Sequence, residues 1–320
     1  MRKLVPISLL LALLACTVFL LTPSALLNSA VVPALPDDLD AYVAERERTA
    51  SERYGLIPGT DKRIRWQQSG QRTEYAVIYL HGFSATRQAF APTAELIADA
   101  LGANLFETRL AGHGHVKQPM AHFHAEDWLD DAAEALTIGA RIGNKVVVIG
   151  TSTGATLALA MANHPAIRNV SALILISPNF APADANAQLL TGPAGPLIAK
   201  LIVGKTRTWT PLNEQQARYW STSYPVDAVV EMMRLVDYVQ ALLPLKIDSD
   251  LLVLISPEDT VVSPTASRQA FARITARRQQ LVEIEDVGDP SHHILAGDIM
   301  SPQSTSAVVT RIVTFVNGSE

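Results

Sequence analysis

Short apolar runs rich in β-branched residues alternate with longer stretches of helical composition along most of the chain. The runs that predict strands lie at 75–80, 103–109, 145–149, 170–176, 251–255 and 281–285. The stretches that predict helices lie at 88–101, 127–142, 155–163 and 306–316. The run 145–149 is almost continuously apolar, which is typical of a strand buried on both faces. The pattern predicts an α/β fold with a mostly parallel central sheet and helices on both of its faces.

Two regions depart from this alternation. Residues 37–53 have helical character before a short strand at 64–66, so we expect a helical preface with a first strand over 37–72 and the main domain over 73–320. The interval 177–250 has a Gly/Pro cluster, many large aromatic residues and a helical pattern at 226–243. We expect an insertion here, at about 180–246, that lies over the sheet edge as a lid, with its aromatic residues packed mainly in its own small core.

The first 36 residues form a third region, which contains no charge between Lys3 and Asp37. The apolar run from Leu4 to Leu21 has 18 residues, close to the roughly 20 that a helix needs to cross a bilayer. Positive residues precede the run and acidic residues follow it. This asymmetry predicts that the segment directs the chain to a membrane and that the folded body lies outside the cytoplasm, periplasmic or extracellular.

Three interpretations of residues 1–36 stay open. Length favours an uncleaved anchor helix. The small residues at 22–24 and 28–30 offer a weak cleavage site for a signal peptide, which would make the protein secreted. The sequence 13–16 is similar to a bacterial lipoprotein box and would make Cys16 a lipidated N-terminus, although the residues after it stay apolar.

Composition narrows the function classes. Basic and acidic residues nearly balance, 26 against 31, so the chain lacks the positive field that a nucleic-acid partner requires. The single cysteine excludes an intramolecular disulfide and a multi-cysteine zinc site. The fold therefore depends on its hydrophobic core, and the apolar fraction of 48% excludes a disordered chain.

The motif G-x-S-x-G occurs at 150–154, with Ser152 at its centre. It lies between the predicted strand 145–149 and the helix that follows. A sharp turn at such a junction makes the serine hydroxyl project, and the flanking glycines let neighbouring backbone approach closely. The amides that begin the helix point toward any oxyanion formed there. Ser152 is therefore the candidate nucleophile.

A serine hydroxyl is a weak nucleophile at neutral pH, so it needs a base and an orienting acid. Asp259 follows the predicted strand 251–255, at the carboxyl end where open α/β sheets place their ligands, and is favoured over Glu258. His292 and His293 follow the last predicted strand, and either could reach the serine. In proteins with this motif, the nucleophile, the acid and the base follow one another along the chain in the order Ser, Asp, His, and these candidates have that order.

The chain resembles serine hydrolases of the α/β-hydrolase fold, and within them the group of monoacylglycerol lipases, bacterial carboxylesterases and serine aminopeptidases. Several motifs in the family's order carry the resemblance, which extends from about residue 75 to the end of the chain. They are LHGF at 80–83, RLAGHG at 109–114, DW at 127–128, GTSTG at 150–154, DTVV at 259–262 and SHH at 291–293, with Asp298 beyond.

The resemblance implies roles for individual residues: Ser152 as nucleophile, Asp259 as orienting acid and His293 as base. His293 is preferred to its neighbour because the family pattern places a serine two residues before the base and an aspartate five residues after it, and Ser291 and Asp298 match.

The resemblance also implies an oxyanion hole made by the backbone N–H groups of Phe83 and Thr153. Three positions depart from the family pattern. Thr151 stands where histidine is frequent, Ala155 where glycine is common, and Pro257 interrupts the usual turn before the acid. The first two alter packing at the turn.

The expected function is a carboxylic-ester hydrolase that acts on a small or lipid-like acyl ester through an acyl-enzyme, without cofactor or metal. A peptidase or amidase with the same triad, and a non-catalytic binding module tethered to the cell envelope, are the alternatives. An enzyme with an aspartate nucleophile is disfavoured because position 152 is serine.

Other suggestive residues receive structural interpretations. Four histidines, at 113, 115, 122 and 124, straddle a glycine-rich turn and do not face one another on a helix as zinc ligands would, so no metal site is expected. His81 and His113 are expected to hydrogen-bond loop backbone beside the site. Arg109 is expected to brace a loop or lie at the surface, and Trp128 to anchor the core.

Overall fold

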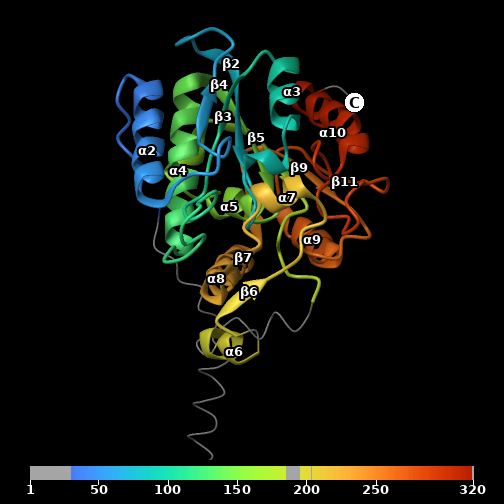
Figure 1. Ribbon diagram of the computed structural model, residues 1–320. Helices are drawn as coiled ribbons and strands as arrows, with labels where there is room; N and C mark the ends of the chain where they lie inside the picture. Colours follow the sequence, from blue (N-terminus) through green and yellow to red (C-terminus); the bar gives the residue numbers. More distant parts are fainter. Residues whose placement is uncertain (1–29, 185–194, 203, 319–320) are drawn as a thin grey trace, which may run out of the picture.

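The computed structural model describes residues 30–184, 195–202 and 204–318 (Figure 1). Within these ranges no helix combines the length and the apolar character that a membrane crossing requires. The apolar run 4–21 and Cys16, on which the expectation of an anchor rests, lie outside the described residues, as do 185–194 of the predicted insertion.

The described residues form a central sheet of seven strands in the order β1-β3-β2-β4-β5-β9-β11. Every neighbouring pair is parallel except β1 and β3, so the short strand of the preface closes one edge of the sheet. The strands are β1 (Arg63–Arg65), β2 (Thr73–Leu80), β3 (Asn104–Glu107), β4 (Gly143–Thr151), β5 (Val170–Ile176), β9 (Asp250–Ile255) and β11 (Gln279–Glu283). The predicted fold class is confirmed.

Helices cover both faces of the sheet (Figure 1). One face carries α2 (Leu39–Tyr54), α4 (Ala125–Ile142), α5 (Thr153–Ala160) and α9 (Pro264–Phe271), whereas the other carries α3 (Thr93–Ala100) and α10 (Pro302–Asn317). Alternate residues of each strand serve the two cores: in β2, Ile78 and Leu80 face the first, and Val77 and Tyr79 face the second.

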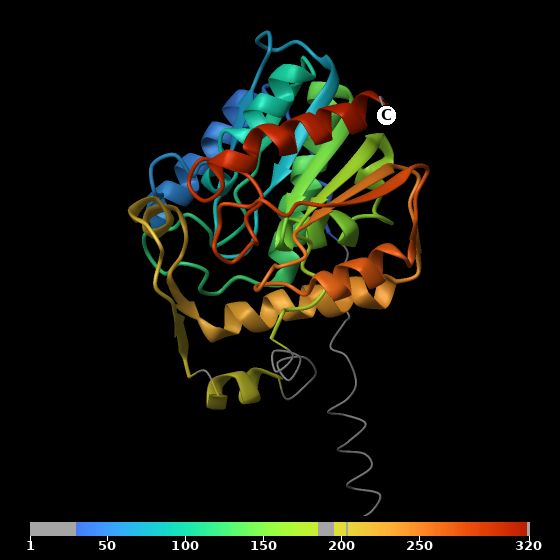
Figure 2. The same cartoon turned by 90° about the vertical axis from the view of Figure 1, so that its right-hand side faces the viewer.

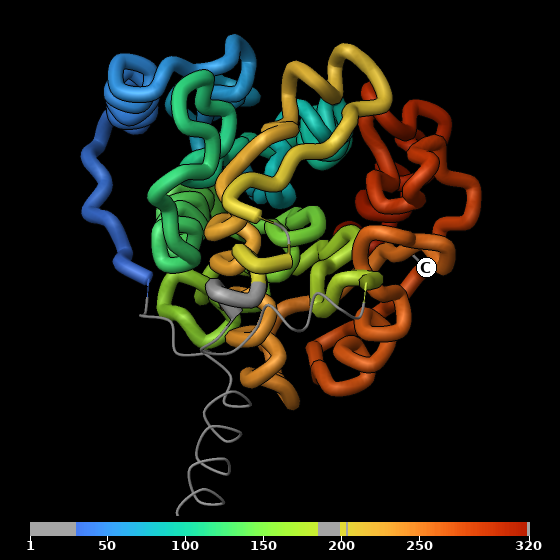
Figure 3. The backbone as a smooth tube through the Cα atoms, turned by 60° about the horizontal axis from the view of Figure 1, so that its bottom comes forward, coloured from blue at the N-terminus to red at the C-terminus, as the bar shows by residue number. Residues whose placement is uncertain are grey.

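The chain leaves the sheet after β5 and returns to it at β9. The segment between them contains α6 (Gly195–Ile202), β6 (Thr206–Thr208), α7 (Glu214–Tyr219), β7 (Ser223–Pro225), α8 (Val226–Leu242) and β8 (Leu245–Lys246). Figure 2 shows α8 running below the sheet, with α6 farther out. In Figure 3 this insertion crosses the middle of the molecule between the green segment 109–124 and the orange and red C-terminal part.

The aromatic residues of the insertion divide between two environments. Tyr224 packs in the insertion's own core with Val226 and Met233, as expected. Trp220 instead packs on the main body, in a cluster with Ala85, Ala89 and Met300. The insertion is therefore fixed to the body through one of its tryptophans.

Several predicted boundaries were wrong for local reasons. The predicted helix 88–101 is a 3-10 turn, η1 (Arg87–Ala89), followed by α3, because Pro92 has no N–H to continue the turn before it. The last strand runs two residues earlier than predicted and pairs with β9 from Gln279 to Glu283. Several elements had no prediction, among them α9, η2 (Pro165–Asn169) and β10 (Ile274–Thr275), which pairs with β8.

Candidate active site

Ser152 occupies a tight turn between the end of β4 and the start of α5. Its φ of 52° and ψ of −117° lie in a region that residues with a side chain rarely adopt. Close packing maintains this conformation, because a Cβ at Gly154 would lie 2.0 Å from the carbonyl oxygen of Leu80, and one at Gly150 would lie 2.5 Å from the carbonyl oxygen of Gly154. The motif thus adopts the strained turn that its sequence predicts.

The loop at residues 81–84, called here the oxyanion loop, passes directly against the serine. A Cβ placed on Gly82 would lie 3.2 Å from Ser152 Cβ. Phe83 follows Gly82, and Thr153 is the first residue of α5. The two residues predicted to supply oxyanion donors therefore lie on the two segments that adjoin Ser152.

Asp259 and His293 form a buried hydrogen-bonded pair. His293 Nδ1 lies 2.8 Å from Asp259 Oδ2, and the two residues are 8% and 7% exposed. The other carboxylate oxygen of Asp259 accepts hydrogen bonds from the backbone N–H groups of Val261 and Val262. Because the carboxylate accepts at Nδ1, His293 Nε2 is left free to act as a base.

The loop that carries His293 is fixed to the end of the sheet near the serine. Ser177 Oγ donates to the carbonyl oxygen of His293, at 2.7 Å, and the N–H of Ser152 donates to the carbonyl oxygen of Ile176. Among the described residues, Ser152 Oγ makes no hydrogen bond to His293. The structure therefore shows the Asp259–His293 hydrogen bond directly and places Ser152 after β4, beside β5, whose following residue Ser177 holds the loop of His293.

His292 points to a different partner from His293. Its Nε2 lies 3.3 Å from Glu258 Oε2, and its φ is 55°. Both residues considered as alternatives, His292 and Glu258, thus pair with each other and not with the Asp259–His293 pair.

Asp289 is a supporting residue that the sequence reasoning missed. It is 1% exposed, and its carboxylate accepts hydrogen bonds from the N–H groups of Ser291, His293 and Ile294 and from the Ser291 hydroxyl. Asp298, which the family pattern highlights, donates its backbone N–H to Ala91. The spacing Asp-Pro-Ser was a usable signal, because an aspartate there can bind the backbone amides that follow it.

Two buried histidines hold the oxyanion loop, as expected. His81 Nε2 accepts from the N–H of Leu110 and its Nδ1 donates to the carbonyl oxygen of Gly82. His113 Nε2 accepts from the N–H of Ser84, at 3.1 Å. Burial lowers the pKa of His113 to about 4 and the pKa of His81 well below its ordinary value, so both rings are neutral acceptors at neutral pH.

Other residues that the sequence singles out have structural surroundings. Trp128 is buried and its indole N–H donates to the carbonyl oxygen of Ala111, which confirms a core anchor. Arg109 is not at the surface: it is 5% exposed and paired with Glu47, so it braces its loop from inside. His122 and His124 are exposed, and the described ranges hold no group of three side chains arranged to bind a metal ion.

The insertion contacts the oxyanion loop through aromatic side chains. The ring of Phe83 lies edge-on to Tyr224 of β7, with 5.3 Å between centroids, and to Trp128 of α4, at 6.0 Å. Edge-to-face contacts of this kind are attractive. The insertion and the main body thus meet beside the candidate nucleophile.

Comparison with known proteins identifies the family. Residues 71–295 match the family model described as serine aminopeptidase, S33. The chain is 25% identical over 253 residues to a thermostable monoacylglycerol lipase from Bacillus sp. (strain H-257), covering 79% of this chain and 94% of that protein.

Solved structures agree on the fold. A structure from work on the metagenome-derived lipolytic enzymes LipS and LipT superposes with a TM-score of 0.68 at 20% identity, covering 82% of this chain and 99% of that one. A monoacylglycerol lipase from Paleococcus ferrophilus gives a TM-score of 0.61 at 14% identity, covering 80% and 98%. The chain belongs to the serine aminopeptidase S33 family, in the lipase- and esterase-like group of α/β-hydrolases.

Proposed function

We propose that the protein hydrolyses carboxylic esters through an acyl-enzyme on Ser152. The observation that carries the proposal is the buried pair of Asp259 and His293, whose carboxylate fixes the proton on Nδ1 and leaves Nε2 as the acceptor. The strained backbone of Ser152, held by close packing at Gly150 and Gly154, supports its role as nucleophile.

The catalytic cycle follows from these roles. His293 Nε2 takes the hydroxyl proton as Ser152 Oγ attacks the acyl carbonyl carbon, and Asp259 stabilises the imidazolium. The N–H groups of Phe83 and Thr153 bind the oxyanion, and the alcohol leaves with the proton from His293. Water then attacks the acyl-enzyme by the same route, which releases the acid and frees Ser152.

A lipid-like substrate is the preferred class within this proposal. An apolar cluster beside Phe83 joins Tyr224 and Met233 of the insertion to Met120 of the segment before α4. Apolar surroundings of this kind beside the nucleophile suit an acyl chain better than a polar group. The similarity to a monoacylglycerol lipase supports a monoacylglycerol or another small acyl ester, with the insertion acting as a lid.

The first experiment measures hydrolysis of short-chain and medium-chain aryl esters, monoacylglycerols and aminoacyl amides by the wild type and by Ser152→Ala. We expect ester turnover by the wild type, and a loss of at least about 10³-fold in Ser152→Ala because the nucleophile is removed. Ser306→Ala, an exposed serine on α10, is the matched control. Retained turnover in Ser152→Ala would overturn the proposal.

Two further readouts separate the alternatives. A fluorophosphonate probe should label the wild type and not Ser152→Ala. If the protein is a non-catalytic binding module, the probe should label neither the wild type nor the variant. Preference for aminoacyl amides over esters, by kcat/KM, would identify a peptidase or amidase, as the family description allows.

We also propose that residues 4–21 attach the exported enzyme to a membrane. The apolar run, the basic residues before it and the acidic residues after it support this placement. The mass of the mature protein should match that of the full chain, and the protein should stay in the membrane fraction after alkaline extraction. A variant chain that starts at residue 30 should be released from that fraction. A mass that lacks the first segment would indicate a signal peptide, and an added lipid mass at Cys16 a lipoprotein.

A further inference from the structure

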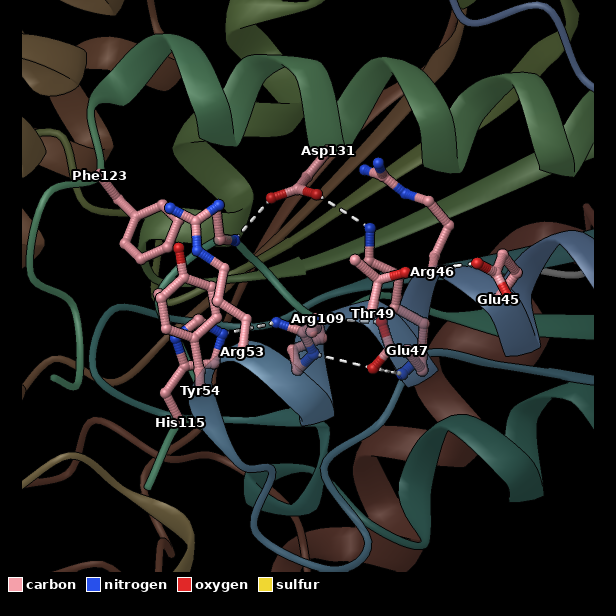
Figure 4. A pocket seen from close by; sticks show the side chains of 14 residues that line it. Glu45, Arg46, Glu47, Thr49, Arg53, Tyr54, Arg109, His115, Phe123 and Asp131 are labelled. Carbon is pink, nitrogen blue, oxygen red and sulfur yellow. Dashed lines mark hydrogen bonds and ion pairs between the residues drawn. The ribbon is translucent and has the colours of Figure 1, made fainter. Parts of the chain in front are cut away.

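The preface helix α2 is joined to the main body by a buried ion pair. Glu47 accepts from Arg109 Nε and Nη2 through its two carboxylate oxygens, each at 2.8 Å, and also accepts from the N–H of Lys62 (Figure 4). Glu47 and Arg109 are 8% and 5% exposed. A bidentate pair with this burial fixes the direction of both side chains.

Lys62 supplies a second link from the preface to the same region. Its ammonium group donates to Asp131 and Glu134 of α4, at 2.9 Å for Asp131. The other oxygen of Asp131 accepts from the N–H of Ala111, at 2.6 Å. The preface therefore holds the segment that begins at Arg109 directly at Arg109 and, through Asp131 of α4, at Ala111.

That segment in turn holds the oxyanion loop. The N–H of Leu110, next to Arg109, donates to His81, and His81 donates to the carbonyl oxygen of Gly82. Two residues after Ala111, His113 accepts the N–H of Ser84. These bonds fix the residues immediately before and after Phe83.

We propose that Glu47 is a positioning residue for the oxyanion hole, acting through Arg109 and the segment 109–113 on the Phe83 amide. The proposal rests on the proposed function, since it assigns the Phe83 N–H to the oxyanion. Glu47 and Lys62 lie outside the residues 71–295 that match the family.

Space beside the ion pair would let Arg109 move if the pair with Glu47 were lost. A cavity of about 290 Å³ lies beside Arg109, lined among others by Arg53, Tyr54 and His115 (Figure 4). An Arg109 side chain released from Glu47 has this space to enter. A donor must lie about 3 Å from the oxyanion to act, so a small displacement of the loop removes its contribution.

The experiment compares Glu47→Gln, Arg109→Met and the double variant with Glu52→Gln, which removes an exposed ion pair with Arg48 on the same helix. For each, kcat and KM are measured on one aryl ester, active sites are titrated with a phosphonate, and the thermal midpoint is recorded. Wild type and Ser152→Ala are run beside them.

In Glu47→Gln we expect kcat per titrated site to fall about 10- to 100-fold with little change in KM, because the oxyanion is bound in the transition state. In the double variant the unpaired buried charge is gone, so the thermal midpoint should recover while kcat stays low. Glu52→Gln should match the wild type in both.

Three other outcomes would contradict the role of Glu47, require a substitute variant, or contradict the proposed function. If kcat per site in Glu47→Gln stays within twofold of the wild type, or recovers with the thermal midpoint in the double variant, Glu47 is only structural. If Glu47→Gln does not fold, Glu47→Asp, which keeps the charge but shortens the side chain, takes its place with the same criteria. If the wild type itself lacks Ser152-dependent turnover, the proposed function fails first.

Discussion

The backbone of Ser152 carries strain that the surrounding residues hold in place. A non-glycine residue in this conformation costs about 1–3 kcal/mol. The contacts at Gly154 leave no room for a relaxed turn, because an added Cβ there would overlap the carbonyl group of Leu80. Close backbone packing around the turn thus presents the hydroxyl, and mutations that loosen the turn should act on activity as well as on stability.

The role of Asp259 can be tested against a second aspartate of the same region. Asp259→Asn removes the carboxylate that fixes the proton on His293 Nδ1, so kcat should fall by about 10³-fold or more with KM little changed. Asp298→Asn, at the position that the family pattern highlights, should keep kcat within about threefold, since its backbone, not its side chain, binds Ala91. Comparable losses in both variants would contradict the assignment.

For single residues, the sequence predicted the pair of Asp259 and His293 and missed the residues that support the site. Motif and chain order were enough to select Ser152 and Asp259, and the family resemblance was needed to choose His293 over His292. Asp289 had only a local signal, the turn sequence Asp-Pro-Ser, and which amides it binds depends on the folded loop. Glu47 could not be recognised, because its importance depends on the cation that the fold brings to it.

Among the elements, α8 contains an acid in an unfavourable place. Asp237 is half-buried, its Oδ2 finds no hydrogen-bond partner among the described residues, and desolvation raises its pKa to about 6. Since the ordinary value is 3.8, the acid lowers the stability of the insertion as pH rises from 3.8 to about 6, and the deficit persists at higher pH.

Asp237→Asn should therefore stabilise the protein at pH 7.5 by about 1 kcal/mol, a figure reduced for partial exposure, and the gain should disappear toward pH 4. Urea unfolding at the two pH values measures it. Asp227→Asn, an exposed acid in the first turn of the same helix, is the control and should give no gain. An equal gain in both variants would point to general charge and not to burial.

Strands were easier to predict than helix boundaries. The buried parallel strands are recognised by their continuous apolar runs, and the bounds of the strand 170–176 were predicted to the residue. The break before α3 depended on Pro92, and the end of β11 depended on pairing with β9, which is a contact between distant parts of the chain. Propensity alone does not contain such pairings.

For the whole molecule, acid should weaken the fold through its buried histidines. The folded pKa of His113 is about 4 and its ordinary value is 6.5, so between these pH values the unfolded chain binds a proton that the folded chain does not. Stability is fully present above pH 6.5 and is lost as pH falls, by about 1.4 kcal/mol per pH unit for each such histidine.

Urea unfolding between pH 7.5 and 5 should show this decline in the free energy of unfolding. His113→Gln should reduce the number of protons taken up on unfolding, which sets the slope of that free energy against pH, by about one. Exposed His122→Gln serves as the control for loss of an imidazole. A slope unchanged in His113→Gln would mean that other groups govern the acid sensitivity.

The insertion is a crossover between two parallel strands that pair directly. The chain leaves β5 at Ile176, which lies beside Leu254 of β9, and returns at the other end of the sheet, where Asp250 pairs with Ala172. Closing a long excursion between paired strands costs little more than closing a short one, since the entropy grows only with the logarithm of length. Evolution can therefore exchange this segment for others without rebuilding the sheet, so that substrate choice and catalysis can change independently.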